Sequence, residues 1–192
     1  DLGVEVASLG IQVHGGMGFI EETGAAQFYR DARIAPIYEG TNGIQAMDLV
    51  MRKLPLENGA VIQSLLSEIQ ATIAELPDSL GEVREALAGG LTALAAATTH
   101  LGERLMSEAY EDALAGATPY LRMMGTVLGG WLLAAGAIVA TRETAIGGAD
   151  RDFLLAKIAT ARFYATQILP QAAGLGSAVT SGAEVVMGVS TS

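Results

Sequence analysis

The residues best suited to chemistry lie in a connector between two predicted helices. Residues 30–45, RDARIAPIYEGTNGIQ, combine charged side chains, an aromatic ring and glycines. Glu39 stands between Tyr38 and Gly40, just before a predicted helix N-terminus. Such a carboxylate could act as a general base if it were buried, because burial raises its proton affinity. It could equally be a structural carboxylate stabilised by the helix dipole, with Gly40 serving only the turn. Spacing alone does not choose between the two.

Helices must position this connector, because the composition disfavours strands. The chain has 192 residues, of which 51% are hydrophobic and only 5% aromatic, so a buried core can form. Alanine, leucine and glycine dominate, whereas strand-like runs of Val, Ile, Thr and Tyr are missing. We therefore predict an all-α fold.

Three short helices are predicted around the connector. Apolar residues at helical spacing predict the first over residues 1–12, ended by the glycine cluster at 14–18. The second is predicted over residues 23–34 and ends at a proline. Thr41 or Asn42 can cap the third, which should continue to about residue 53.

Longer helices are predicted beyond a linker at residues 55–59. Their apolar stripes cover residues 61–75, 78–115, 119–144 and 150–168, with a possible bend at Gly89 and Gly90 and a restart at Pro170. Four helices of this length and alternation indicate an up-and-down helical bundle.

One of these helices could also cross a membrane by its composition. Residues 123–141 are 19 consecutive uncharged residues, which is close to the length that spans a bilayer. Glycines and threonines are frequent in this stretch, no basic cluster flanks it, and the neighbouring amphipathic segments need a central partner. We expect a helix buried in the bundle, and no membrane partner.

The charge and the absence of cysteine exclude several classes of site and partner. The formal net charge of −10 disfavours a nucleic-acid partner. Without cysteine there can be no disulfide and no thiolate metal site, which fits a reducing compartment, and we expect a cytoplasmic protein. The chain opens on Asp1 inside a predicted helix, without a signal-peptide pattern, so we expect a fragment of a longer protein.

Two motifs give the first 45 residues a family resemblance. The first is QVHGGMGF at residues 12–19, and the second is RDARI at residues 30–34 running into IYEGTNGIQ at residues 37–45. In this order and spacing they resemble the end of the catalytic region of the acyl-CoA dehydrogenases. The resemblance ends near Leu54, which gives a first predicted domain at residues 1–54.

The resemblance implies a reaction for the connector. In that family the glutamate of the Tyr-Glu-Gly-Thr motif is often the catalytic base, which here is Glu39. It would remove the α-proton of an acyl-CoA thioester while the β-hydrogen leaves as hydride to flavin N5, giving the trans-2-enoyl-CoA. Tyr38 and Gly40 would contact the substrate, and the missing side chain at Gly40 would let the acyl chain approach the backbone.

The same resemblance implies a bound FAD and further partners. It assigns FAD contacts to Gln12, Val13, His14, Gly15 and Gly16, which would reach the FAD of a neighbouring subunit, and to Thr41 and Asn42 beside the base. It also implies an electron-transfer flavoprotein as electron acceptor and a homo-oligomer, dimer or tetramer. Gly43 departs from the family, where Glu or Gln is frequent. We expect Arg30 and Asp31 to form a structural ion pair.

The run IYEGTNGIQAMDLVMRKL at residues 37–54 is followed by predicted helices that end in FYATQILPQAA at residues 163–173. On these residues the second predicted domain, 59–192, resembles the extra helical C-terminal domain of the larger acyl-CoA dehydrogenases, the group that includes the 3-methylmercaptopropionyl-CoA dehydrogenases. We expect no chemistry there. His100 is predicted to lie at the core boundary, and the carboxylates at 103, 108, 111 and 112 to form a solvated face without a metal. The alternative to an enzyme is a helical oligomerisation module. The chain alone is expected to be inactive and to bind FAD weakly.

Overall fold

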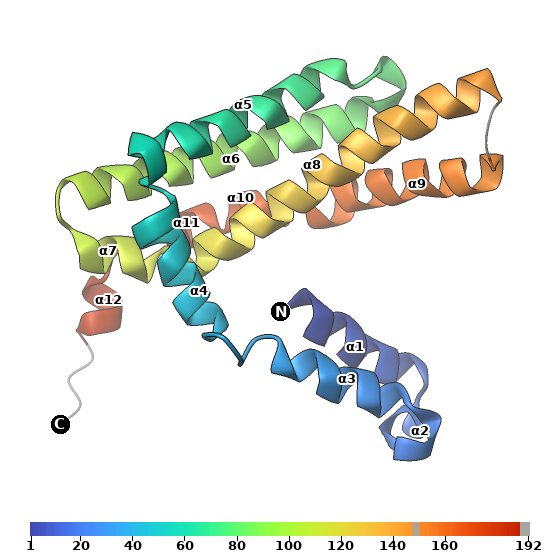
Figure 1. Ribbon diagram of the computed structural model, residues 1–192, viewed down its shortest axis with the longest axis horizontal. Helices are drawn as coiled ribbons and strands as arrows, with labels where there is room; N and C mark the ends of the chain where they lie inside the picture. Colours follow the sequence, from blue (N-terminus) through green and yellow to red (C-terminus); the bar gives the residue numbers. More distant parts are fainter. Residues whose placement is uncertain (148–149, 189–192) are drawn as a thin grey trace. The chain divides into compact units, whose positions relative to one another are not determined.

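The computed structural model describes residues 1–147 and 150–188, and every regular element within them is helical (Figure 1). The predicted all-α class is therefore confirmed. The chain divides into two compact units, Asp1–Ala46 and Met47–Ser192. The boundary falls inside helix α4 (Asn42–Asp48), earlier in the chain than the domain boundary predicted near residue 54.

Unit 1 is a short helical hairpin. Helix α1 (Leu2–Val13) packs against α3 (Ala25–Ile34), and the single turns α2 (Gly16–Phe19) and η1 (Glu21–Thr23) connect them. Gly18 lies where the chain folds back, and a side chain there would collide with the Ile11 carbonyl and the His14 Cβ. The absence of a side chain at Gly18 thus allows α2 to close against α1.

The apolar side chains of α1 are not covered within unit 1. Leu2, Val6, Leu9 and Val13 are between 53% and 86% exposed, and α1 contains no buried residue. Apolar faces of this size are unusual on a finished protein surface. They are typical of a helix that packs against further protein.

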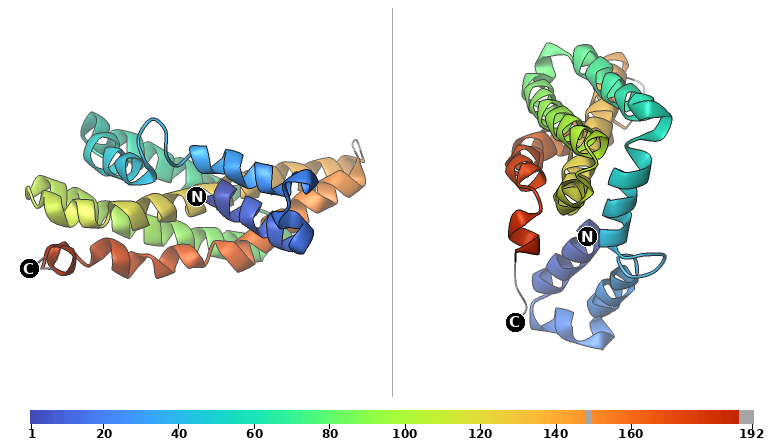
Figure 2. Two further views of the ribbon diagram at one scale, coloured as in Figure 1. Left: turned by 90° about the horizontal axis from the view of Figure 1, so that it is seen from below. Right: turned by 90° about the vertical axis from the view of Figure 1, so that its left-hand side faces the viewer.

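Unit 2 is an up-and-down bundle, as predicted. Its four long helices alternate in direction and lie side by side (Figures 1 and 2). They are α5 (Ala60–Glu75), α6 (Gly81–Met106), α8 (Ala117–Ile146) and α9 (Arg151–Phe163). The shorter elements are η2 (Leu49–Lys53), η3 (Leu56–Gly59), η4 (Asp78–Leu80), α7 (Tyr110–Ala115), η5 (Tyr164–Ile168), α10 (Gln171–Gly174), α11 (Gly176–Thr180) and α12 (Glu184–Met187).

A leucine ladder in and before α6 forms the centre of this bundle. Leu80, Leu87, Leu94 and Leu101 recur every seven residues and are each at most 1% exposed. This spacing keeps one stripe of a long helix facing its neighbours over the whole length. The isoleucines of α5, Ile62, Ile69 and Ile73, fill the same core.

The second long helix is shorter than the sequence predicts. The apolar pattern predicted one helix to residue 115, but α6 ends at Met106 and α7 begins at Tyr110. Glu108 between them has φ +61°, in the left-handed region that a continuous helix cannot contain. The predicted bend at Gly89 and Gly90 is not an interruption, because α6 runs through both glycines. Gly147, with φ +73°, ends α8.

Helix α8 is central to the bundle but is not buried all round. It packs against α5, α6 and α9, and the Trp131 indole nitrogen donates to Thr72 Oγ1 of α5 at 2.7 Å. In the part of the chain that the structure describes, α8 is the one helix long and apolar enough to cross a membrane. Leu132 and Val139 on its outer side are 63% and 55% exposed, so the prediction of complete burial is wrong for that face.

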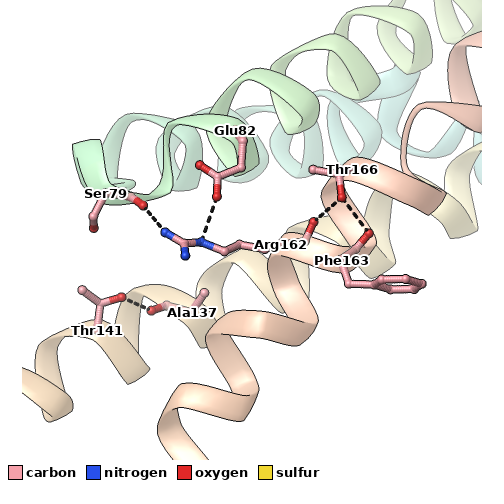
Figure 3. Close-up of polar contacts among 7 residues, drawn as sticks. All are labelled: Ser79, Glu82, Ala137, Thr141, Arg162, Phe163 and Thr166. Carbon is pink, nitrogen blue, oxygen red and sulfur yellow. Dashed lines mark hydrogen bonds and ion pairs between the residues drawn. The ribbon is translucent and has the colours of Figure 1, made fainter.

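Polar contacts tie the ends of the helices together. Figure 3 shows the Arg162 guanidinium of α9 donating to Glu82 at 2.8 Å and to the Ser79 carbonyl at 2.6 Å, which anchors α9 to the start of α6. In the core, the Thr98 and Tyr120 hydroxyls lie 2.7 Å apart and share a hydrogen bond between α6 and α8. These contacts fix how the long helices are aligned.

The glycine between α7 and α8 is predicted to be essential for packing. A Cβ at Gly116 would collide with the backbone carbonyl of Val179, which cannot move away as a side chain can. We expect Gly116→Ala to lower the free energy of unfolding by about 1–3 kcal/mol, as for other overpacked sites. Gly89→Ala is the matched control, because that position in α6 has open space. Its stability should stay the same or rise by up to about 1 kcal/mol in urea unfolding.

The buried tyrosine predicts a loss of stability at high pH. Burial raises the pKa of Tyr120 to about 12, partly offset by its hydrogen bond to Thr98. The unfolded chain ionises near pH 10, so this stabilisation is present below pH 10 and is lost as the pH rises to 12. We expect the free energy of unfolding to fall by up to about 3 kcal/mol over this window. Tyr120→Phe should weaken the dependence of the free energy of unfolding on pH between pH 10 and 12. An unchanged dependence would mean that Tyr120 is not its source.

Candidate functional site

The connector that carries Glu39 is a turn with two left-handed residues. Helix α3 ends at Ile34, whose carbonyl accepts from the amides of Ile37 and Tyr38 at 3.0 and 3.1 Å. Glu39 then has φ +53° and Gly40 φ +93°. Positive φ is uncommon for a glutamate and costs free energy, so the turn must be held by its surroundings.

Gln45 supplies part of that support. Its Nε2 donates to the Glu39 carbonyl oxygen at 2.9 Å, and its backbone amide donates to Thr41 at 3.0 Å. Gln45 thereby ties the left-handed turn to the first turns of α4. Gln45 closes the second motif, but the sequence alone indicates no role for it. No local pattern distinguishes it from an exposed helical glutamine.

The Glu39 side chain itself is exposed. Among the described residues none donates a hydrogen bond to its carboxylate, and none buries it. Burial, which would raise the proton affinity of this carboxylate, is therefore not found within the described chain. Tyr38 beside it is 54% exposed, and Gly40 is partly buried. Bound substrate or further protein would have to supply the desolvation that a base requires.

The predicted flavin loop lies at the C-terminal end of α1. Gln12 and Val13 belong to its last turn, and His14 follows as its C-cap with Nδ1 2.8 Å from the Gly10 carbonyl. Gly15 has φ +63°, and a Cβ at either Gly15 or Gly16 would meet nothing within 4 Å. The loop thus presents exposed, open backbone, as close approach of a diphosphate requires.

The structure does not bring the two predicted sets together. Asn42 Nδ2 donates to Asp1 at 2.5 Å, so Glu39, Thr41 and Asn42 lie by the first turn of α1. The loop after Val13 lies at the opposite end of this 12-residue helix, about 18 Å away along its axis. An FAD bound at the turn would have to extend along the whole of α1 to contact that loop.

The predicted ion pair of Arg30 and Asp31 is wrong. Arg30 instead pairs with Glu21 at 3.1 Å, and Asp31 accepts from Gln27 at 2.6 Å. Successive residues on a helix point in different directions, whereas residues three or four apart are neighbours. The Arg30–Glu21 pair joins α3 to η1, and the Gln27–Asp31 hydrogen bond lies within α3.

The described residues of unit 2 form no cluster of side chains suited to catalysis or metal binding. His100 is half-buried, and its Nε2 is buried without a hydrogen-bond partner among the described residues. Asp112 is not part of a solvated face, since it accepts from the Ala183 amide at 2.8 Å and lies 3.9 Å from Arg104. Across residues 1–147 and 150–188 no three acidic, histidine or cysteine side chains are grouped to hold a metal. Met106 at the end of α6 is 81% exposed.

Two grooves lie on either side of Leu54 and Ile62. One, of about 700 Å³, runs between η2 and α5 and reaches Met124. The other, of about 510 Å³, lies between η3 and α6 and reaches Met106. Both are lined mainly by apolar side chains and have no paired acid and base. Neither resembles a catalytic pocket.

Two protein-family models match the chain over nearly its whole length. Residues 65–190 match the model described as acetyl-CoA dehydrogenase C-terminal like. Residues 1–54 match the model of the acyl-CoA dehydrogenase C-terminal domain. The two matched regions are separated by residues 55–64.

Known acyl-CoA dehydrogenases are also similar to the chain in sequence. The chain is 45% identical over 180 residues to 3-methylmercaptopropionyl-CoA dehydrogenase of Ruegeria pomeroyi, covering 92% of this chain and 30% of that protein. It is 33% identical over 170 residues to a broad-specificity linear acyl-CoA dehydrogenase of Mycobacterium tuberculosis, covering 83% and 28%. A match of 43 residues at 44% identity, covering 22% and 11%, is to a caffeyl-CoA reductase-Etf complex subunit of Acetobacterium woodii. The chain spans less than a third of the length of these relatives.

The turn geometry predicts different effects for two neighbouring glycines. At φ +93° an alanine at Gly40 would be strained, and its Cβ would lie 3.1 Å from Ile44 Cγ2. Gly43, in the first turn of α4, has only ordinary contact at 3.8 Å. We expect Gly40→Ala to destabilise the turn by about 1–3 kcal/mol and to speed amide exchange at Gln45. Gly43→Ala should leave amide exchange at Gln45 unchanged or slow it. Equal effects of the two substitutions would contradict this geometry.

Proposed function

Because this chain belongs to the acyl-CoA dehydrogenase family, we propose that it is the part of an FAD-dependent acyl-CoA dehydrogenase that carries the catalytic base. In this proposal residues 1–54 end the catalytic helical domain, and residues 59–192 form the extra helical domain of the larger members. The observation that carries the proposal is the Tyr38-Glu39-Gly40-Thr41 motif on a left-handed turn, with its carboxylate exposed.

Glu39 is the proposed base for the α-proton of an acyl-CoA thioester. An α C–H bond is a weak acid, so the thioester carbonyl must be polarised while the carboxylate loses water around it. The turn fixes the Glu39 backbone through Gln45 and leaves the side chain free to face a substrate. FAD, when bound, accepts the β-hydrogen as hydride, and the product is the trans-2-enoyl-CoA.

Tyr38 and Gly40 are the proposed substrate contacts on either side of the base. Tyr38 is exposed, so its ring is available to a ligand. Gly40 has no side chain to hold an acyl chain away from the backbone, although its φ of +93° already requires glycine for the turn. The two requirements reinforce each other at this position.

Two groups of residues are proposed to hold FAD. Thr41 and Asn42 would contact it beside the base, where the start of α4 offers free backbone amides. Gln12, Val13, His14, Gly15 and Gly16, about 18 Å from the turn along α1, would contact the FAD of a neighbouring subunit. A flavin site shared between subunits and a homo-oligomer are part of this proposal.

The electron acceptor and the cellular setting are further parts of this proposal. We propose an electron-transfer flavoprotein as partner, which the name of the caffeyl-CoA reductase-Etf complex subunit supports. The proposed role is β-oxidation of acyl-CoA thioesters in the cytoplasm. The names of the relatives include a 3-methylmercaptopropionyl and a linear acyl substrate, so the proposed class is the acyl-CoA thioester itself.

A second candidate function concerns unit 2 by itself. Its helices expose apolar side chains without an accompanying acid–base pair, which favours a helical interaction module with no catalysis in isolation. Both functions can hold within one protein. Only the first requires the motif around Glu39.

Replacing the proposed base tests the first function. In the longer protein to which we assign the chain, Glu39→Gln should slow flavin reduction by acyl-CoA about 10²–10⁴-fold while FAD remains bound. Glu22→Gln is the matched control, since Glu22 is also exposed and lies in the same unit. A panel of acyl-CoA chain lengths in anaerobic stopped-flow would define the substrate. Flavin reduction at the native rate in the Glu39→Gln variant would mean that the base lies outside this chain.

A further inference from the structure

One hydrogen bond crosses the functional turn from α4. Gln45 Nε2 donates to the Glu39 carbonyl oxygen at 2.9 Å, and among the described residues no other group donates to this oxygen. The carbonyl belongs to the planar peptide group that joins Glu39 to Gly40, so its direction is set by ψ of Glu39 and φ of Gly40. The Gln45 side chain therefore acts directly on the backbone of the residue that carries the proposed base.

The two turn residues have no local preference that would keep this conformation. Glu39 has φ +53°, which is uncommon for a residue with a side chain, and Gly40 has φ +93°. Glycine adopts positive and negative φ about equally, so Gly40 can follow a rotation of its neighbour. A contact from outside the two residues must hold them, and the Gln45 amide makes such a contact.

The backbone of Gln45 is itself fixed by α4. Its amide nitrogen donates to the Thr41 carbonyl at 3.0 Å, at the start of that helix. The side chain then reaches back six residues along the chain to the Glu39 carbonyl. Gln45 thus connects the left-handed turn to a regular helix.

The missing side chain of Gly40 makes room for this contact. A Cβ at Gly40 would lie 3.3 Å from Gln45 Nε2 and 3.1 Å from Ile44 Cγ2, and both distances are tighter than ordinary van der Waals contact. The Gln45 amide therefore lies directly over Gly40. The glycine and the hydrogen bond depend on each other.

The direction of the Glu39 side chain depends on this turn. Its Cβ is bonded to Cα, so a change in φ or ψ of Glu39 redirects the carboxylate relative to the rest of unit 1. A general base must come within about 3 Å of the proton that it removes or of a bridging water. A misplacement of about 1 Å can lower the rate of reaction by about 10²-fold.

We propose that Gln45 is a positioning residue for the base. Its amide holds the peptide group between Glu39 and Gly40 in one orientation, and this orientation directs the Glu39 carboxylate to the α-carbon of a bound acyl-CoA. The inference rests on the reaction proposed for Glu39. Gln45 itself takes no part in proton transfer.

Gln45→Met tests the contact, because methionine has a side chain of the same length without the donor. Gln45 is exposed and methionine favours helices, so folding and FAD content should be unchanged. In the longer protein, the limiting rate of flavin reduction at saturating acyl-CoA should fall about 10–10²-fold. The acyl-CoA concentration that gives half this rate should change by less than about twofold. Gln70→Met makes the same change at an exposed position of α5 and should keep the native rate.

A double variant separates a positioning role from a general structural one. If Gln45 acts only through Glu39, Gln45→Met should not slow flavin reduction further in a chain that already carries Glu39→Gln. Three results would overturn the inference: a native limiting rate for Gln45→Met, a loss confined to acyl-CoA or FAD binding, or a further loss of about tenfold in the double variant. The base assignment would survive these results as long as Glu39→Gln alone is slow. A native rate for Glu39→Gln alone would instead overturn the proposed function, and this inference with it.

Discussion

The close approach of backbone and small residues along α8 is the constraint on which unit 2 depends. Gly116 admits the Val179 carbonyl, Gly129 admits the Tyr164 ring, and Gly130 admits Leu169. Each contact brings a different part of the C-terminal half against one helix. Larger residues at these positions would push the C-terminal segment away from α6 and α8. The same glycine-rich composition makes α8 resemble a membrane helix by hydropathy, although its neighbours cover several of its sides.

A different constraint shapes the functional turn. Two successive left-handed residues reverse the chain after α3, and a glutamate in that conformation is costly unless other interactions hold it. Gln45 provides one such interaction from α4. The turn therefore presents the Glu39 carboxylate in a fixed backbone setting, at the edge of a unit whose α1 face is apolar and uncovered. Both features are those of a half-site completed by further protein.

The sequence predicted the helical class, the bundle and most of the ends of its long helices because apolar periodicity and glycine or proline breaks are local signals. It did not predict the interruption at Glu108, where a residue other than glycine takes a left-handed conformation. Nor did it predict that Leu132 and Val139 are exposed, since uniform apolarity carries no direction. At the site, the motif identified Glu39, but its exposure and the bond from Gln45 depend on packing. The ion pair expected for Arg30 and Asp31 was wrong because successive residues of a helix point in different directions, and Arg30 pairs with Glu21 of η1 instead.

The central claim is that Glu39 removes the α-proton of an acyl-CoA thioester. The most direct measurement is solvent-deuterium exchange at Cα of an acyl-CoA analogue that cannot lose its β-hydrogen, bound to the longer protein. Mass spectrometry of the recovered analogue reports proton removal separately from hydride transfer. The account predicts rapid deuterium incorporation with the native enzyme and almost none with Glu39→Gln. Incorporation at the native rate by Glu39→Gln would contradict it.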